Sequence, residues 1–312
     1  MTALDVAHVS DIYPSRNGKP DAIIERKDPV VYSSQPDNSP VAYDLIKKYE
    51  QNGFLIINNI FSDGEIRCFQ DELERLRDAP EIRLKDEAII EPGSGEVRSV
   101  FAVHNISPVF KKLASDRRLA AIAEYILGDH VYIHQSRVNY KPGFRGKEFY
   151  WHSDFETWHV EDGMPRMRAL SMSIILTDNY EYNGPLLLIP KSHLDFVICS
   201  EETPANHFKR SLKKQEYGIP CDNILEKLIR RSGIFAATGN SGSVIIFDCN
   251  IMHGSNGNIT PYPRSNIFLV YNAIKNRIFD PFCDQPPRPE WVASRNSIKT
   301  MTPTDYKLTD YA

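Results

Sequence analysis

Hydrophobic and polar residues follow two different periods along this chain, and these periods predict where its helices and strands lie. Residues 43–50 have helical spacing, and this helix is expected to end near Asn52-Gly53, before a buried strand at Phe54–Ile57. Ser62 and Glu65 form a capping box, in which each side chain satisfies a free backbone N–H at a helix start. Four apolar residues then recur at helical spacing and are expected to pack on the core: Ile66, Phe69, Leu73 and Leu76.

A polar loop and one more helix are predicted before residue 130. Residues 83–98 are polar and contain Pro92-Gly93, which is typical of a loop. Residues 115–127 have a helical pattern, and Gly128 is the expected stop, because glycine readily adopts the left-handed conformation that ends a helix.

Short strands dominate the rest of the chain. Residues 131–140 alternate, which places Ile133, Gln135, Arg137 and Asn139 on one face and Tyr132, His134, Ser136 and Val138 on the other. A strand with so polar a face is expected at the mouth of a barrel, where a polar lining has a use. Further strands are predicted at residues 168–176, 185–190, 243–247 and 266–272. Together they predict a mainly β fold with flanking helices, of the jelly-roll or double-sheet barrel type.

The pattern also suggests how the chain is divided. Residues 1–40 are rich in Pro, Asp and Ser without a steady period, so an extended N-terminal arm is expected there. Residues 41–312 are expected to form a single domain, with a charged helical insertion near residues 205–232. A length of 312 residues fits one large β-barrel as well as two smaller domains.

Composition excludes several classes of protein. A net charge of −4 provides no basic field for nucleic acid or an anionic membrane surface. The five cysteines are widely spaced and form no CxxC pair, which argues against a disulfide framework and a structural zinc site. No apolar stretch approaches the ~18 residues of a membrane span, and residues 1–10 lack a signal-peptide pattern. A soluble, cytoplasmic protein is therefore expected.

The strongest chemical signal lies in residues 149–171. His152 and Asp154 are two residues apart, so on an extended segment both side chains point to the same side. A further histidine would complete a two-His, one-carboxylate set, which binds Fe(II) and leaves open positions for a co-substrate and oxygen. The best candidate is His253, which follows a predicted strand and precedes Gly254.

Two other pairs have the same spacing and compete for the metal. His159 and Glu161 are followed by Asp162-Gly163, and the pair is read as part of a polar turn. His193 and Asp195 follow a predicted turn after a strand, where a histidine hydrogen-bonded to the backbone is expected. The pair His152/Asp154 is preferred because aromatic residues flank it and a distant His-Gly follows a second strand.

Two longer motifs extend this signal. Residues 151–159 read WHSDFETWH, and residues 161–168 read EDGMPRMR. With these motifs the chain resembles the ectoine hydroxylases, within the phytanoyl-CoA dioxygenase-like group of Fe(II)/2-oxoglutarate oxygenases, from about Tyr43 to the C-terminus. The resemblance implies a double-stranded β-helix with Fe(II) at its open end, and 2-oxoglutarate and O2 as co-substrates. It also implies hydroxylation of ectoine to 5-hydroxyectoine, with release of succinate and CO2; a homodimer is expected.

In this interpretation, His152, Asp154 and His253 hold the iron, and other residues hold the 2-oxoglutarate. Arg264 lies eleven residues after His253, at the start of a predicted strand, and its guanidinium can clamp the far carboxylate with two parallel hydrogen bonds. Ser255 and Asn139 are expected to add hydrogen bonds, and Lys141 a further positive charge.

The substrate residues follow from the chemistry of ectoine, a small zwitterion with a cationic amidine and a carboxylate. Trp158 is the predicted wall for the cation, since aromatic faces attract cations. Phe149 and Phe247 are expected near the iron, and Gln135 is the predicted hydrogen-bonding group. Three alternatives stay open: an oxygenase for another small amine or amino acid, a metal-binding barrel without catalysis, and a zinc hydrolase with the same ligands.

Overall fold

A seven-stranded antiparallel sheet forms the centre of the computed structural model, which describes residues 10–91, 95–212 and 215–311. Its strands follow the order β2-β11-β7-β13-β5-β4-β3. Their bounds are β2 Phe54–Ile57, β3 Ala88–Ile90, β4 Val97–Phe101, β5 Val131–Lys141, β7 Ala169–Ile175, β11 Val244–Asp248 and β13 Arg264–Ala273. The six strands predicted from the sequence in this sheet and its smaller neighbour are all present.

A four-stranded sheet, in the order β10-β8-β12-β6, packs against the large one. It consists of β6 (Phe149–His152), β8 (Leu186–Leu188), β10 (Phe235–Ala237) and β12 (His253–Ser255). Side chains of both sheets share one buried cluster, in which Leu186 and Leu188 meet Ile245 and Phe268. Two sheets packed face to face in this way confirm the predicted double-sheet barrel, mainly β with flanking helices.

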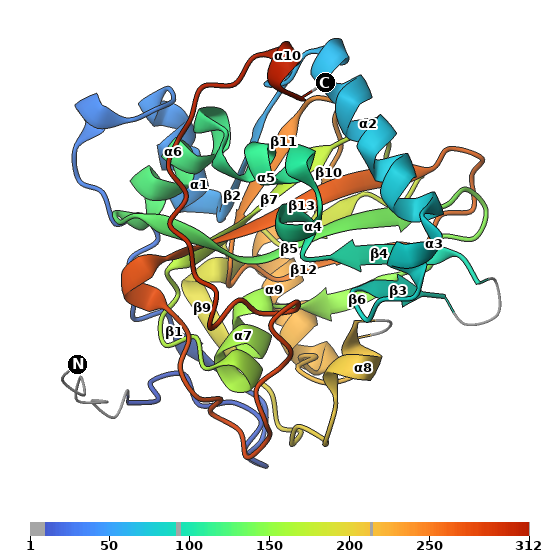
Figure 1. Ribbon diagram of the computed structural model, residues 1–312. Coiled ribbons are helices and arrows are strands. Elements are labelled where there is room, and N and C mark those ends of the chain that lie inside the picture. Colours follow the sequence, from blue (N-terminus) through green and yellow to red (C-terminus); the bar gives the residue numbers. More distant parts are fainter. Residues whose placement is uncertain (1–9, 92–94, 213–214, 312) are drawn as a thin grey trace, which may run out of the picture.

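Helices cover the outer face of the large sheet (Figure 1). They are α1 (Tyr43–Asn52), α2 (Asp63–Asp78), α5 (Pro108–Ser115) and α6 (Arg117–Leu127). The capping box of Ser62 and Glu65 starts α2, and the left-handed residues Gly53 and Gly128 end α1 and α6, as the sequence predicts. The other α-helices of the described residues are α3 (Pro80–Arg83), α4 (Val103–Ile106), α7 (Asp154–Asp162), α8 (Phe208–Ser211), α9 (Asp222–Ser232) and α10 (Leu308–Tyr311).

Two local predictions are wrong. Residues 83–98 are not one loop, because β3 and the start of β4 pair within them; Pro92 and Gly93 lie outside the described residues. The alternation of β5 is also interrupted, since a bulge opposite Val270 and Tyr271 shifts the register. Ile133 consequently faces the helix-covered core, while Gln135 faces the other side of the sheet.

The N-terminal segment runs along the body of the protein. Its strand β1 (Ala22–Glu25) pairs antiparallel with β9 (Asp195–Ile198). Arg16, from the same segment, is buried and forms ion pairs with Glu156 and Glu161 of α7 at 2.6 and 2.5 Å. The division into an arm of residues 1–40, one domain of residues 41–312 and an insertion near 205–232 stays a prediction. None of the helices in the described ranges has the length and apolar character to cross a bilayer.

The end of helix α7 allows a test of how closely residue 163 is packed. Gly163 ends this helix with a φ of +75°, and a Cβ there would lie 2.3 Å from the Asp280 carbonyl oxygen. Gly163→Ala should therefore lower the free energy of unfolding by roughly 2 kcal/mol or more, from backbone strain and steric overlap together. Chemical denaturation measures the loss.

Gly95 is the matched control for this substitution. It has a φ of +70°, and a Cβ added to it meets no heavy atom of the described residues within 4 Å. Gly95→Ala should thus report the backbone strain alone and cost less than Gly163→Ala. Equal losses in the two variants would contradict the close packing of residue 163 against the C-terminal segment.

Candidate active site

Three side chains from two separate segments meet at one end of the barrel. His152 is the last residue of β6, and His253, the first residue of β12, lies opposite it in the antiparallel pairing. Asp154 is not on an extended segment as predicted: Ser153 is extended, and Asp154 begins helix α7. The ligand atoms of the three residues nevertheless lie within 4.8 Å of one another, and all three residues are buried. This cluster has the composition and spacing of a two-His, one-carboxylate metal site.

Backbone contacts fix which nitrogen of each imidazole faces the cluster. Nδ1 of His152 lies 2.8 Å from the Tyr150 carbonyl oxygen, and Nδ1 of His253 lies 3.1 Å from that of Ile251. A carbonyl oxygen only accepts hydrogen bonds, so each Nδ1 carries the proton and each Nε2 presents its lone pair. The two Nε2 atoms lie 3.7 and 3.9 Å from the carboxylate oxygens of Asp154.

The ionisation of the cluster also suits a metal. Burial lowers the pKa of His253 to about 4, and the neighbouring His152 adds to the shift, so His253 is neutral at physiological pH. Burial alone would raise the pKa of Asp154, but the facing imidazoles and Arg137 hold it well below its usual range. Neutral imidazoles and an ionised carboxylate are the forms that bind a divalent cation.

The two competing pairs have other partners. His159 is buried between the Met164 carbonyl oxygen at 2.8 Å and Asp11 at 3.0 Å. Glu161 is not in a polar turn: it lies in helix α7 and binds Arg16 and His207.

His193 bonds to the backbone, as predicted, with Nε2 3.0 Å from the Glu50 carbonyl oxygen. Asp195 pairs with Arg231 at 2.5 Å. Neither His159/Glu161 nor His193/Asp195 belongs to a three-ligand cluster among the described residues.

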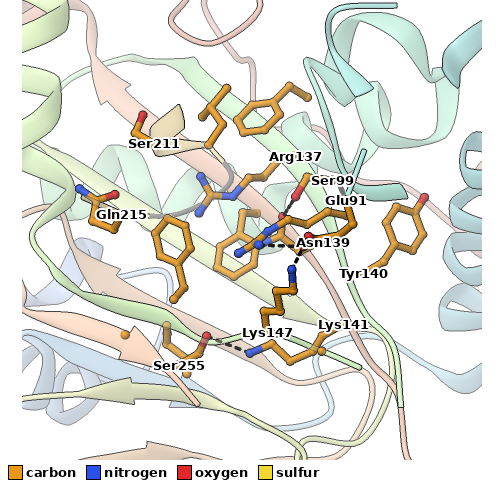
Figure 2. A pocket seen from close by; sticks show the side chains of 18 of the residues that line it. Glu91, Ser99, Arg137, Asn139, Tyr140, Lys141, Lys147, Ser211, Gln215 and Ser255 are labelled. Carbon is orange, nitrogen blue, oxygen red and sulfur yellow. Dashed lines mark hydrogen bonds and ion pairs between the residues drawn. The ribbon is translucent and has the colours of Figure 1, made fainter. Parts of the chain in front are cut away.

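A cavity of about 390 Å³ opens beside the three ligands (Figure 2). Arg264 lines it and is only 6% exposed. Its Nε and Nη1 have no hydrogen-bond partner among the described residues. Burial lowers the pKa of Arg264 to about 10, which still leaves it charged at neutral pH. A buried guanidinium with unpaired nitrogens is costly, and an anion in the cavity would stabilise it.

Lys141 lies next to Arg264, because the end of β5 pairs with the start of β13. Its Nζ donates a hydrogen bond to Ser255 Oγ at 3.0 Å (Figure 2). It donates another to the Asn256 carbonyl oxygen at 2.5 Å. Burial, followed by the charges of Arg264 and Arg98, lowers the pKa of Lys141 to about 6. Asn139 also lines the cavity and accepts a hydrogen bond from Ser99 Oγ at 2.7 Å. The four residues predicted to bind 2-oxoglutarate therefore lie together.

The residues predicted to bind substrate are divided between the cavity and the core. Gln135, Phe149 and Trp158 line the cavity, and Trp158 also packs in a buried apolar cluster, where it is 2% exposed. Phe247 is absent from the cavity wall in the described part of the chain. It lies 1% exposed in the core between the sheets, with its ring 5.3 Å from that of His253. Phe268 of β13 occupies the wall instead.

Sequence reasoning missed the arginines of this wall other than Arg264, among them Arg137 and Arg288. Arg137 donates to Gln135 Oε1 at 2.6 Å, and its guanidinium lies 4.9 Å from the centre of the Phe268 ring. Asp162 at the end of α7 holds Arg288 with two hydrogen bonds of 2.7 and 2.5 Å. The polar face predicted for residues 131–140 includes Arg137, so the sequence could have indicated that this residue lines the cavity. Arg288 lies in a loop, where no sequence pattern indicates a place in the cavity wall.

The assembled site can hold a divalent cation, a dicarboxylate and a small polar molecule in one enclosure. The three ligands lie in its wall, together with the guanidinium of Arg264 and the amine of Lys141. Aromatic rings and further arginines line the remaining space. Such a site brings an activated co-substrate and a second reactant together with little water.

Comparison with known proteins agrees with this geometry. The family model "Phytanoyl-CoA dioxygenase (PhyH)" matches residues 49–266. The ectoine dioxygenase of Stutzerimonas stutzeri is 55% identical over 292 residues, which are 94% of this chain and 97% of that protein. The ectoine dioxygenase of Streptomyces avermitilis is 46% identical over 288 residues, 92% of this chain and 97% of that protein.

Solved structures are similarly close. The crystal structure of EctD from S. alaskensis with 2-oxoglutarate and 5-hydroxyectoine is 46% identical and superimposes with a TM-score of 0.88, covering 96% of this chain and 100% of that one. The form of the same protein with bound Fe has a TM-score of 0.86 at the same identity and coverage. The family match and these near-complete relatives leave one assignment: the chain belongs to the phytanoyl-CoA dioxygenase (PhyH) family.

Proposed function

We propose that this protein hydroxylates ectoine to 5-hydroxyectoine, using Fe(II), 2-oxoglutarate and O2 and releasing succinate and CO2. The observation that carries the proposal is a single cavity that contains both the three-ligand cluster and the unpaired Arg264. The relatives named ectoine dioxygenase, and EctD solved with 2-oxoglutarate and 5-hydroxyectoine, support ectoine as the substrate. A zinc hydrolase or a metal-binding barrel without catalysis has no need for a buried cation awaiting an anion.

His152, Asp154 and His253 would hold the iron through two imidazole nitrogens and one carboxylate. When bound, Fe(II) activates O2 with electrons from 2-oxoglutarate, which loses CO2 and becomes succinate as the substrate is hydroxylated. The residues of the chain provide position and charge. The hydrogen bonds of both Nδ1 atoms to backbone carbonyl oxygens keep the imidazole rings turned toward the metal position.

Arg264 is assigned to the far carboxylate of 2-oxoglutarate, which would pair with its free Nε and Nη1. Lys141 and Ser255, already hydrogen-bonded to each other, present an ammonium and a hydroxyl beside it. Asn139 is the remaining polar group assigned to this end of the cavity. Together these residues orient the co-substrate with its keto acid end toward the three ligands.

The rest of the cavity suits a zwitterion. Trp158, Phe149 and Phe268 offer ring faces to the amidine cation, an interaction worth roughly 0.5–2 kcal/mol when partly desolvated. Arg137 and Arg288 offer guanidinium groups to the carboxylate, and Gln135 is held between Arg137 and the Val292 carbonyl oxygen. Phe247 lies in the core behind the cavity wall and packs against the ring of His253.

We also propose a homodimer in the cytoplasm. Phe144, Tyr182, Ile259 and Tyr262 are between 52% and 84% exposed. They lie on neighbouring loops, since Phe144 N donates to the Thr260 carbonyl oxygen and the rings of Tyr182 and Tyr262 lie 6.1 Å apart. An exposed aromatic and apolar patch of this kind favours a protein interface, which sedimentation can test.

The proposed cytoplasmic location has a separate basis. Five free cysteines support a reducing compartment.

Removal of any metal ligand should abolish the reaction. His152→Ala, Asp154→Ala and His253→Ala should each lose ectoine-dependent release of succinate and bind Fe(II) far more weakly than the unaltered protein. His193→Ala is the control, because His193 is a buried histidine whose imidazole bonds to backbone instead. Iron retained by His152→Ala but lost by His193→Ala would show that the wrong pair was assigned.

Arg264→Gln should raise the KM for 2-oxoglutarate steeply and leave Fe(II) affinity nearly unchanged. Loss of a charge-assisted contact to a buried carboxylate costs about 2–5 kcal/mol. The exposed Arg230→Gln on α9 is the control for loss of one positive charge. Steady-state kinetics at saturating ectoine and iron measure the effect, and an unaltered KM in Arg264→Gln would refute the assignment.

Lys141 should make 2-oxoglutarate binding depend on pH. Its pKa is lowered to about 6, so the free protein at neutral pH has Lys141 largely deprotonated. A bound dianion stabilises the ammonium and raises this pKa, so binding takes up a proton and affinity falls as pH rises from 6 toward the pKa of the complex. Calorimetry of the Co(II)-loaded protein in buffers of different ionisation enthalpy counts the proton. Lys141→Met should lose this uptake, and an identical proton count in both proteins would contradict the role.

A further inference from the structure

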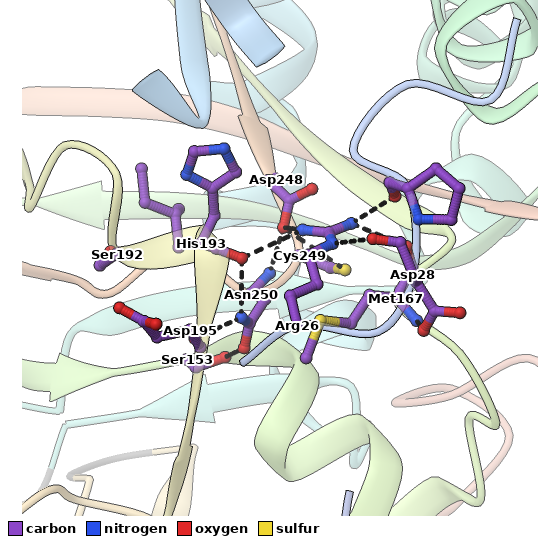
Figure 3. Close-up of polar contacts among 12 residues, drawn as sticks. Arg26, Asp28, Ser153, Met167, Ser192, His193, Asp195, Asp248, Cys249 and Asn250 are labelled. Atoms are coloured by element: carbon purple, nitrogen blue, oxygen red, sulfur yellow. Dashed lines mark hydrogen bonds and ion pairs between the residues drawn. The ribbon is translucent and has the colours of Figure 1, made fainter. Parts of the chain in front are cut away.

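Arg26, in the N-terminal segment just after β1, joins four parts of the chain through one buried side chain (Figure 3). The guanidinium is 3% exposed and donates to Asp248 Oδ1 at 2.9 Å and to the Met167 carbonyl oxygen at 3.0 Å. It also donates to the carbonyl oxygens of Asp28, Pro29 and His193 at 2.9, 2.9 and 3.3 Å. Every nitrogen of the side chain is therefore used, and the position of the guanidinium is fixed from several directions.

Asp248 connects Arg26 to the loop that carries His253. It is the last residue of β11, and its Oδ1 also accepts a hydrogen bond from the backbone N–H of Asn250 at 2.8 Å. Residues 249–252 form the short connection between this strand and His253. The carboxylate of Asp248, held by Arg26, thus sets where that connection begins and how it turns.

Asn250 extends the network to the other two ligands. Its side-chain N–H groups donate to the carbonyl oxygens of His193 and Asp195, and its Oδ1 accepts a hydrogen bond from Ser153 Oγ at 3.1 Å. Ser153 lies between His152 and Asp154 in the sequence. The backbone N–H of Phe155 adds a second link, with a 2.8 Å hydrogen bond to the Cys249 carbonyl oxygen. The two ligand-bearing segments are therefore tied to each other through residues 249 and 250.

We propose that Arg26 is a positioning residue for the metal centre, acting on the ligands through Asp248 and Asn250. Arg26 contacts none of the three ligands, so its effect comes from the loop geometry that it maintains. Without it, the buried carboxylate of Asp248 loses its cation, and the connection to His253 must move toward water or another donor. Residues behind a metal site that orient its ligands typically change metal affinity by about 10–100-fold.

This inference rests on the metal site of the proposed function and gives a role to a segment outside the residues that carry the family motifs. An alternative role is attachment of the N-terminal segment alone, through β1 and Arg26. The two roles differ in what they predict for the metal: attachment affects stability, whereas positioning also affects metal affinity in protein that remains folded.

Titration of the metal-free protein with Co(II), followed by its visible absorption well below the melting temperature, separates the roles. Arg26→Gln should bind Co(II) about 10–100-fold more weakly than the unaltered protein. Arg118→Gln is the matched control, because Arg118 pairs with Glu65 and Asp116 between α2 and α6, away from the ligands. It should lose stability and keep its Co(II) affinity. Equal Co(II) affinity in Arg26→Gln, Arg118→Gln and the unaltered protein would overturn the proposal.

Two further variants keep the test decisive if Arg26→Gln does not fold. Arg26→Lys retains the charge opposite Asp248 but cannot make all five hydrogen bonds, so a several-fold loss of Co(II) affinity is expected. In the double variant Arg26→Gln/Asp248→Asn, the neutral amide removes the unpaired charge and should restore part of the fold and of the affinity. Unchanged affinity in Arg26→Lys would also overturn the positioning role.

His253→Ala separates this proposal from the proposed function. If the unaltered protein binds one Co(II) and His253→Ala does not, the metal site stands whatever Arg26→Gln shows. If the unaltered protein binds no Co(II), the metal site of the proposed function is refuted independently of Arg26. Arg26 then has a structural role alone.

Discussion

The antiparallel pairing of β6 with β12 places His152 directly opposite His253, and the rest of the site depends on that register. A slip by one residue would turn one imidazole to the far face of the sheet, because side chains alternate along a strand. The neighbouring pairing of β12 with β8 holds β12 from its other edge, where His253 faces Leu188. Asp154 does not lie on a strand, because the start of α7 places its carboxylate beside the two imidazoles.

Charge is the second constraint on this architecture. Arg137, Lys141, Arg264 and Arg288 all line one cavity, and Asp154 is the buried carboxylate among the described residues of its wall. Burial first, and then the charges of Arg264 and Arg98, lower the pKa of Lys141, so gathering these cations in one wall works against folding. Only Arg288 has a full carboxylate partner, Asp162. The protein therefore maintains an excess of positive charge that anionic ligands relieve, and part of their binding free energy comes from this relief.

Much of the fold and of the metal site could be predicted from the sequence because local signals carry them. The capping box at Ser62 and the glycine that ends α6 each depend on residues close together in the chain. The choice of His152 and Asp154 over two pairs of equal spacing came from flanking residues and from family motifs.

The features that escaped prediction depend on long-range packing. The bulge in β5 is set by its partner β13, so the sequence of β5 alone could not show that Ile133 faces the core. Helix α7 is buried along its whole length, and it has no amphipathic period to reveal it. Phe247 follows the strand pattern expected of a cavity residue but points between the sheets. Arg288 reaches the cavity only because Asp162 holds it.

The wide separation of the metal ligands along the chain has a consequence for how the protein is made. A ribosome adds about 5–20 residues per second, so the 101 residues from His152 to His253 take roughly 5–20 s to synthesise. Throughout that interval the nascent chain holds an imidazole and a carboxylate that cannot retain a metal alone. Arg26 precedes both ligand segments in the chain and is made still longer before its partner Asp248. A metal that needs all three ligands can therefore be held only after β12 has been made and has paired with β6.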